Sequence, residues 1–222
     1  MHIMFIGRRD YLDCFDVFEK KYGLIDRSDI YKSGNKRYIK QGQAKVKVEK
    51  DQVLQSKLVM CFASSSAYDS KFDDVIWVMT ALLGGTPISK LFVNVREKLS
   101  LCYYCSARFD PSKGLIFIES GVENENIEKA KAAILEQFDE IKNGKFTQDE
   151  LDKVILALKN QLKAVGDSAG AIESYYLSQL CEGKIESPDQ KIEVIKNIKK
   201  QDIVEVANLY STVMDYTLTS EG

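Results

Sequence analysis

Two strand-like segments joined by a tight turn constrain the fold of this chain more than any other feature. The segments Leu101–Phe109 and Gly114–Ser120 are rich in aromatic and aliphatic side chains, and Asp110-Pro111-Ser112-Lys113-Gly114 has the composition of a turn. This pattern predicts a β-hairpin, whose strands are antiparallel. Segments with helical spacing of apolar residues lie on both sides of it, so we expect an α+β fold in which helices face an antiparallel sheet.

The rest of the chain divides into further helices and strands with no linker-like or low-complexity tract between them. The capping box Thr147-Gln148-Asp149-Glu150 marks the start of one helix. We therefore interpret residues 1–222 as a single domain, with a helical bundle and a closing strand after the hairpin. The predicted helices are Asp10–Tyr22, Tyr68–Leu83, Ile88–Leu99, Glu123–Lys142, Thr147–Val165, Ala169–Glu182, Pro188–Asn197 and Gln201–Val213. The other predicted strands are His2–Ile6, Ala44–Lys50, Gln55–Ser64 and Met214–Thr219.

The histidine content limits the chemistry that this chain can perform alone. His2 is the single histidine. Zinc hydrolases use two or three histidines, or histidines with carboxylates, and Ser-His-Asp and Cys-His enzymes need a histidine that reaches the nucleophile. We interpret His2 as structural and expect no catalytic residue and no metal site in this chain. The net charge of −2 excludes a global basic field that would attract nucleic acid or anionic lipid.

Targeting and membrane signals are absent from the sequence. No apolar run approaches the ~20 residues of a membrane span. The start Met1-His2-Ile3-Met4-Phe5-Ile6 is too short for a signal peptide and has no basic region. We therefore expect a soluble, cytoplasmic chain that does not bind membranes. The five cysteines fit reduced thiols, because their number is odd.

The cysteine pair Cys102-Tyr103-Tyr104-Cys105 spells C-x-x-C. A zinc ribbon would need a second such pair, and a redox C-x-x-C belongs at a helix N-terminus. This pair falls in a predicted strand, where positions i and i+3 point to opposite faces. We expect the two sulfur atoms to diverge and the cysteines to fill core space, with a redox or metal-binding role as the less favoured alternative. Tyr103 and Tyr104 should likewise face opposite ways.

The segment around the hairpin start resembles a hallmark of the insulinase-type zinc peptidases, the inverzincins, which include the mitochondrial processing peptidase and pitrilysin. In that family a glycine-rich turn precedes a Ser-(Arg/Lys)-Leu-Phe helix, and an Arg-Glu-Lys stretch leads into Leu-(Gly/Ala)-Tyr. The matching residues here are Gly84-Gly85, Ser89-Lys90-Leu91-Phe92, Arg96-Glu97-Lys98 and Leu101-Cys102-Tyr103. The order of elements agrees over essentially the whole chain, and the likeness is greatest to small bacterial members found as pairs.

The resemblance implies a fold, a partner and a site. Family proteins consist of halves of roughly this length, and the zinc half carries His-x-x-Glu-His with a distal Glu. This sequence lacks that motif, so it looks like the C-terminal, non-metal half of a longer protein. The implied partners are a zinc-bearing homologous half or subunit, which alone holds zinc, and a peptide substrate. Arg96 and Tyr103 match the family's Arg–Tyr pair, which hydrogen-bonds the bound peptide across the chamber.

Several alternatives stay open at this level. Gly84-Gly85 fits a flexible loop that gates substrate entry or, as we favour, a helix C-cap. Taken alone, Arg96 fits a surface ion pair and Tyr103 a core aromatic residue. Cys102 stands where the family often has Gly or Ala, and Lys90 where it often has Arg. The whole protein is either a bipartite peptidase or an inactive homologue that serves as a scaffold, and an uncovered apolar face would favour a homodimer of the isolated domain.

Overall fold

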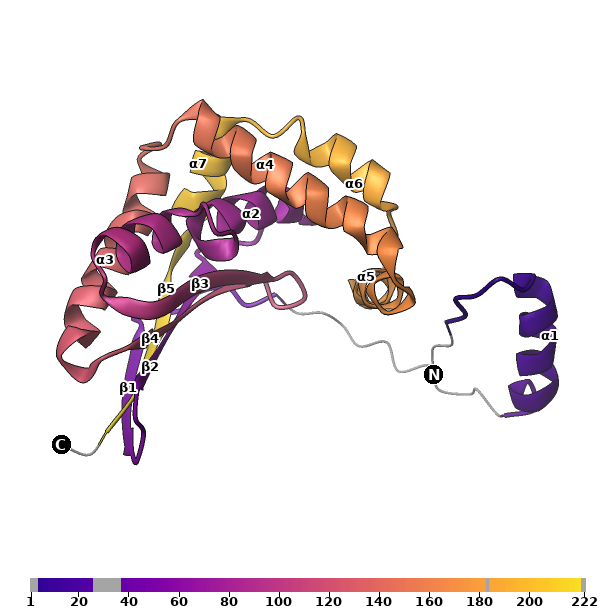
Figure 1. Cartoon of the computed structure of the whole chain (residues 1–222), viewed down its shortest axis with the longest axis horizontal. Helices are drawn as coiled ribbons and strands as arrows, with labels where there is room; N and C mark the ends of the chain where they lie inside the picture. Colours follow the sequence, from indigo (N-terminus) through magenta and orange to yellow (C-terminus); the bar gives the residue numbers. More distant parts are fainter. Residues whose placement is uncertain (1–3, 26–36, 183, 221–222) are drawn as a thin grey trace.

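A twisted sheet with helices on one face organises the computed structural model, which describes residues 4–25, 37–182 and 184–220 (Figure 1). Its strand order is β1-β5-β2-β4-β3, and β1 pairs with β5 in parallel while the other neighbours are antiparallel. The α+β class, the helix-faced sheet and the hairpin are thus confirmed, but the sheet is mixed rather than purely antiparallel. The strands are β1 (Lys45–Asp51), β2 (Ser56–Ser64), β3 (Cys102–Asp110), β4 (Leu115–Val122) and β5 (Tyr210–Ser220).

The predicted helices are present, with shifted ends. The Thr147 hydroxyl accepts a hydrogen bond from the Glu150 amide at 3.1 Å, and the Glu150 carboxylate accepts one from the Thr147 amide at 2.6 Å, which confirms the capping box. The α-helices are α1 (Tyr11–Tyr22), α2 (Asp73–Thr80), α3 (Ile127–Lys142), α4 (Gln148–Lys163), α5 (Ala169–Glu182), α6 (Pro188–Ile195) and α7 (Lys200–Leu209). Two π-helical segments, η2 (Ala81–Gly85) and η3 (Leu91–Lys98), lead from α2 to β3.

The hydrophobic core lies between the sheet and the helix layer. Alternate residues of β2 and β4 point into it, as the two-residue period of a strand requires. The Phe62 ring meets the Phe138 ring of α3 edge-on, with centroids 4.9 Å apart. Burying each such side chain contributes about 2 kcal/mol to stability. The strand residues in this core include Leu58, Met60, Phe62, Ile116 and Ile118.

Three local predictions need correction. Residues 4–6 are not a strand, and Met4 and Phe5 are exposed; residues 1–3 of that prediction, and the turn expected at Ser33-Gly34-Asn35, lie outside the described residues. Strand β1 is exposed along its whole length rather than half-exposed, because it forms one edge of the sheet. Helix α7 ends at Leu209, since the next residues pair with the end of β2.

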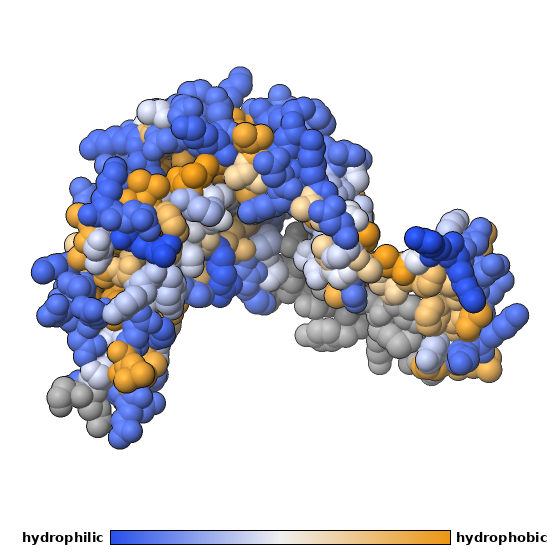
Figure 2. All heavy atoms as spheres, viewed as in Figure 1, coloured by the Kyte–Doolittle hydropathy of each residue, from blue (hydrophilic) through white to orange (hydrophobic). Residues whose placement is uncertain are grey.

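Helix α1 buries none of its residues. It lies away from the sheet and the helix layer (Figure 1), and Figure 2 shows apolar side chains gathered on its surface. The Asp10 carboxylate caps its start by accepting a hydrogen bond from the Leu12 amide at 2.8 Å. The exposed apolar residues of α1 are Tyr11, Leu12, Phe15, Val17 and Tyr22.

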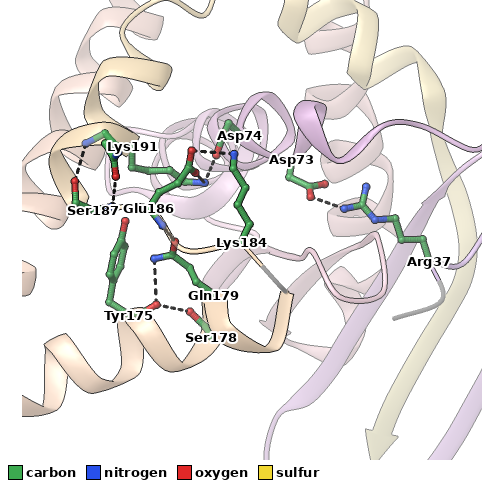
Figure 3. Close-up of polar contacts among 11 residues, drawn as sticks. Arg37, Asp73, Asp74, Tyr175, Ser178, Gln179, Lys184, Glu186, Ser187 and Lys191 are labelled. Carbon is green, nitrogen blue, oxygen red and sulfur yellow. Dashed lines mark hydrogen bonds and ion pairs between the residues drawn. The ribbon is translucent and has the colours of Figure 1, made fainter. Parts of the chain in front are cut away.

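A charged cluster fixes α6 to the start of α2 (Figure 3). The buried Asp74 carboxylate forms an ion pair with Lys191 of α6, and Lys191 also lies 3.7 Å from Glu186. Glu186 pairs with Lys184 at 2.9 Å. Next to them Asp73 pairs with Arg37. Each negative charge of this cluster has a positive partner, so we interpret it as structural.

Candidate functional site

The predicted site residues Arg96 and Tyr103 line one surface cavity of about 400 Å³. Arg96 comes from η3, and Tyr103 comes from the first residues of β3, which follow after one turn of chain. The short connection therefore brings both side chains to the same cavity, and their spacing in the sequence predicts that they lie near each other. The other lining residues are Glu97, Ser100, Leu101, Cys102, Glu123 and Asn126.

The Arg96 side chain lies flat against its own helix. Its guanidinium carbon is 4.6 Å from the centre of the Phe92 ring, a cation–π contact one helical turn away. Its Nη1 atom lies 3.7 Å from the Glu97 carboxylate, and the side chain is 39% exposed. An exposed contact of this kind is weak, so the guanidinium keeps N–H donors for a ligand.

Tyr103 is exposed, which excludes the interpretation as a core aromatic residue. Its hydroxyl donates a hydrogen bond to the Glu123 carboxylate at 2.9 Å. This hydrogen bond and the negative charge of Glu123 raise the pKa of the Tyr103 phenol. The phenol therefore remains a protonated donor at neutral pH. Glu123, the residue directly after β4, is a site residue that the sequence analysis missed.

A β-bulge shapes the start of β3. Cys102 pairs with Val122 and Tyr104 with the next residue Gly121, so Tyr103 is an extra residue without a partner in β4. The bulge changes which side chains share a face. Tyr103 and Tyr104 are both exposed, and Cys102 and Cys105 both pack against the core. The expectation that the two cysteines face opposite sides is wrong: they stand opposite Val122 and Ser120, which are two residues apart on β4 and share one face.

The two glycines of the motif lie inside the last helical turn, η2, and the residue after it, Thr86, is extended. The favoured prediction of a C-cap glycine is therefore wrong, because the C-cap residue is Thr86 and both glycines lie before it. Gly84 is buried, and a Cβ there would meet the Ala107 backbone nitrogen at 2.7 Å. Its lack of a side chain lets η2 approach β3. A Cβ on Gly85 would meet nothing closer than 3.5 Å. The gating role of this pair stays a prediction.

Arg96 also borders a second, smaller cavity of about 240 Å³ that reaches the glycine turn. Its wall includes Gly84, Gly85 and Phe92, and the cavity extends to Cys105 and Ser106 of β3. The motif residues therefore surround Arg96 on two sides. Phe92 belongs to the motif Ser89-Lys90-Leu91-Phe92. The sequence did not predict that its ring would contact the Arg96 guanidinium.

Within residues 4–25, 37–182 and 184–220, no three His, Cys, Asp or Glu side chains are grouped so that they could hold a metal ion. His2 lies outside these residues. Among the described helices, none combines the length and the apolar character that a membrane crossing requires.

Comparison with known proteins gives relatives in one family. The chain is 32% identical over 192 residues to the probable inactive metalloprotease YmfF of Bacillus subtilis, covering 86% of this chain and 43% of that protein. The chain thus spans less than half the length of this curated relative. A conserved protein of Enterococcus faecalis V583 has a similar structure, with a TM-score of 0.74, 29% identity and coverage of 83% of this chain and 44% of that one.

A protease from Helicobacter pylori shares the fold at a TM-score of 0.80 and 19% identity, over 97% of this chain and 54% of that chain. Residues 1–158 match the sequence profile described as the peptidase M16 inactive domain. This match includes the glycine turn, Arg96 and Tyr103, and it agrees with the resemblance to the insulinase-type peptidases. The chain belongs to the M16 peptidase family and corresponds to the inactive, C-terminal, non-metal half of its proteins.

Proposed function

We propose that this chain is the non-catalytic half of a zinc metallopeptidase-like protein and holds an extended peptide for a partner half that carries the zinc. The observation that carries this proposal is the shared cavity of Arg96 and Tyr103 at the start of β3. Both side chains offer hydrogen-bond donors to a ligand in that cavity. In this function residues 1–222 would act as one peptidase-like domain.

Strand β3 offers a second means of holding a peptide. It forms an edge of the sheet, opposite to β1, so one row of its backbone groups is free of strand pairing among the described residues. An extended peptide can add to such an edge through main-chain hydrogen bonds. Tyr103 is the bulged residue at the start of this edge. A peptide paired along β3 would therefore pass next to the cavity that Arg96 and Tyr103 line.

The two donors would act on different parts of the peptide backbone. The Arg96 guanidinium lies against Phe92 and can donate hydrogen bonds to a carbonyl oxygen or a carboxylate without losing a strong ion pair. The Tyr103 hydroxyl must exchange the Glu123 carboxylate for a peptide carbonyl. The partner's zinc would supply Lewis-acid activation and a nucleophilic water. The residues of this chain would bind the substrate and orient its carbonyl.

A second candidate function is a scaffold without peptidase activity. It is favoured by the match to an inactive domain and by the relative named as a probable inactive metalloprotease. In this case the chain would pair with a homologous half, and the cavity would serve binding alone. A cytoplasmic location and a homodimer of the isolated domain stay predictions.

The experiment that separates these functions compares the chain alone with the chain plus its native other half. Zinc content and hydrolysis of unstructured peptides are measured in both samples. We expect neither zinc nor hydrolysis from the chain alone, and both after reconstitution. A stable complex that binds peptide but has no zinc and no activity would support the scaffold and contradict the peptidase assembly.

A further inference from the structure

Helix α1 carries an aromatic stripe along one of its faces. Tyr11, Phe15, Phe18 and Tyr22 follow one another at intervals of four, three and four residues, which places their side chains on the same side of a helix. The rings of Phe18 and Tyr22 stack with their centroids 6.3 Å apart. Tyr11 and Phe15 are 71% and 60% exposed. A contiguous exposed apolar surface of this kind marks an interaction site.

The opposite face of α1 is mostly charged. Asp13, Asp16 and Lys20 lie there, as the helical period of 3.6 residues requires. Val17 lies on the same side, because two positions correspond to about half a turn from Phe15. The helix therefore has one face suited to an apolar surface and one face suited to water.

A helix as short as α1 depends on packing for its stability. It has 12 residues, and isolated helices shorter than ~12–15 residues are marginal in water. The Asp10 cap satisfies one amide at its start, but it buries no apolar surface. Since α1 buries none of its residues, the described part of this chain does not supply the surface that such a helix needs.

The connection after α1 is long enough to reach a neighbouring unit. The helix lies apart from the sheet and the helix layer (Figure 1). Among the described residues, the chain after α1 first pairs with the sheet at Tyr38, whose amide donates to the Lys113 carbonyl at 2.7 Å. Residues 23–37 separate the two points, and a chain of that length extends to at most ~50 Å. Helix α1 can therefore lie on a second domain while β1 stays in this one.

The comparisons indicate which unit this is. The matched stretch is 43% of the Bacillus subtilis relative and 44% of the Enterococcus faecalis protein, so more than half of each lies outside it. This chain corresponds to the C-terminal half, so its counterpart half lies on the N-terminal side. Helix α1 is the first described helix of the chain and thus the helix nearest in sequence to that counterpart.

The sheet of this chain shows what surface a homologous half has to offer. The helices cover one face of the sheet (Figure 1). Val59 of β2 and Phe117 of β4 alternate with core residues, so they lie on the other face, and both are partly exposed. Met214 of β5, which is 40% exposed, stands on the same face opposite Cys61, as Phe117 does. A homologous half with the same sheet would offer a similar apolar face without helices.

We propose that α1 packs its aromatic stripe on the helix-free face of the sheet in the preceding, homologous half, and so joins the two halves. This inference rests on the partner half named in the proposed function and adds the element of this chain that binds it. The stripe would bury its large rings there, while Asp13, Asp16 and Lys20 would stay in water. Helix α1 is thus part of this chain in sequence but part of its partner in packing.

The test measures the affinity of the full chain for its native preceding half, produced as a separate chain, by isothermal titration calorimetry. Phe15→Ser should weaken the association about thirtyfold, as expected for the loss of a buried aromatic anchor. Val17→Ser is the matched control, because Val17 is also apolar and is 55% exposed but lies on the opposite face. Its effect should be less than about twofold, as for a residue outside the interface.

Two further measurements locate the docking surface. In the chain alone, Phe15→Ser should leave the urea midpoint unchanged, and the α1 amides should exchange quickly with deuterium. Addition of the other half should slow this exchange at least about tenfold, because the helix then opens only with the interface. These results together would support docking of α1 on the preceding half.

Three outcomes would overturn the inference. One is equal affinity of Phe15→Ser and the wild type. Another is a lowered urea midpoint of Phe15→Ser in the chain alone, which would place α1 on its own sheet. The third is a homodimer of the chain that Phe15→Ser abolishes, which would assign the stripe to a second copy. Failure of the wild type to bind the other half would contradict the proposed partner as well, whereas binding without hydrolysis would contradict only the peptidase assembly and leave the role of α1 supported.

Discussion

The Tyr103 hydroxyl donates a hydrogen bond of 2.9 Å to the Glu123 carboxylate, which joins the start of β3 to the residue that follows β4. A regular ladder counted from the turn, where Asp110 pairs with Leu115, would place Tyr103 opposite Val122 inside the hairpin. The bulge gives that position to Cys102 and turns Tyr103 out to the cavity. The local irregularity of β3 is therefore what makes Tyr103 available to a ligand.

Replacement of Tyr103 by Phe should lower peptide turnover by the reconstituted protein about tenfold while leaving the fold intact. The change removes one hydroxyl donor from an exposed side chain, so it removes a ligand contact and little packing. Tyr216→Phe is the matched control. Tyr216 of β5 donates a similar hydrogen bond to Glu49 of β1 at 2.5 Å, at the edge of the sheet opposite to β3. Equal turnover by the Tyr103 variant and the wild type would refute the binding role.

Replacement of Arg96 by Ala should weaken peptide binding about tenfold, as expected for loss of one charge-assisted hydrogen bond. Arg96→Lys should recover part of the affinity, since it keeps the charge but not the planar donor pair. Binding is measured by fluorescence anisotropy with a labelled peptide and stability by thermal melting. A large drop in the melting temperature of Arg96→Ala, with binding unchanged, would instead favour a structural role.

The glycine turn provides a matched pair of stability tests. Gly84→Ala should destabilise the fold by about 2 kcal/mol, because the new Cβ would lie 2.7 Å from the Ala107 backbone nitrogen and overpack η2 against β3. Gly85→Ala, whose Cβ would lie 3.5 Å from its nearest neighbours, should be neutral or slightly stabilising. Urea unfolding measures both changes. Equal effects of the two substitutions would contradict the close packing at Gly84.

Removal of the Lys191 charge should cost about 2 kcal/mol of unfolding free energy. Lys191→Met keeps most of the aliphatic chain but leaves the buried Asp74 carboxylate without its ion-pair partner. The control is Lys153→Met, which breaks an exposed ion pair with Asp149 within α4 and should cost at most about 0.5 kcal/mol. Urea denaturation of both variants checks the difference, and similar costs would show that the cluster in Figure 3 is not buried enough to matter.

The rate of Cys102 alkylation by iodoacetamide should rise with pH through a midpoint near 7. The pKa of Cys102 is lowered from 9.0 to about 7, so the thiolate forms at lower pH and the curve moves to lower pH. In Cys105→Ala the principal hydrogen-bond donor is absent, and the midpoint should shift upward. Peptide mapping of residues 99–108 over a pH series gives both curves. A wild-type midpoint near 9 would show that the thiolate is not stabilised.

The local features of this fold could be predicted from the sequence because they depend on neighbouring residues. The hairpin turn at 110–114 and the capping box at Thr147 are set by turn and cap chemistry within a few positions. The spacing of Arg96 and Tyr103 also correctly indicated that they share a surface, since a helix end and the next strand start connect them.

The missed features depend on partners that are distant in the sequence. The parallel pairing of β1 with β5 joins residues more than 160 positions apart, such as Val46 and Asp215, and no local pattern encodes it. Helix α7 ends early because Tyr210–Thr212 pair with β2. A regular two-residue period places Cys102 and Cys105 on opposite faces of β3, and the bulge breaks that period and puts both against the core.

The position of β5 has a consequence for how the chain folds during synthesis. Among the described residues β5 is the last strand in chain order, yet it lies between β1 and β2 and is the strand that β1 pairs with in the sheet. A nascent chain that has not reached residue 210 can form the β2–β4–β3 part of the sheet with its helices, but β1 has no strand beside it and β2 keeps an open edge. The sheet is therefore completed only when β5 leaves the ribosome, and until then β1 and β2 each have a free edge with which another chain can pair.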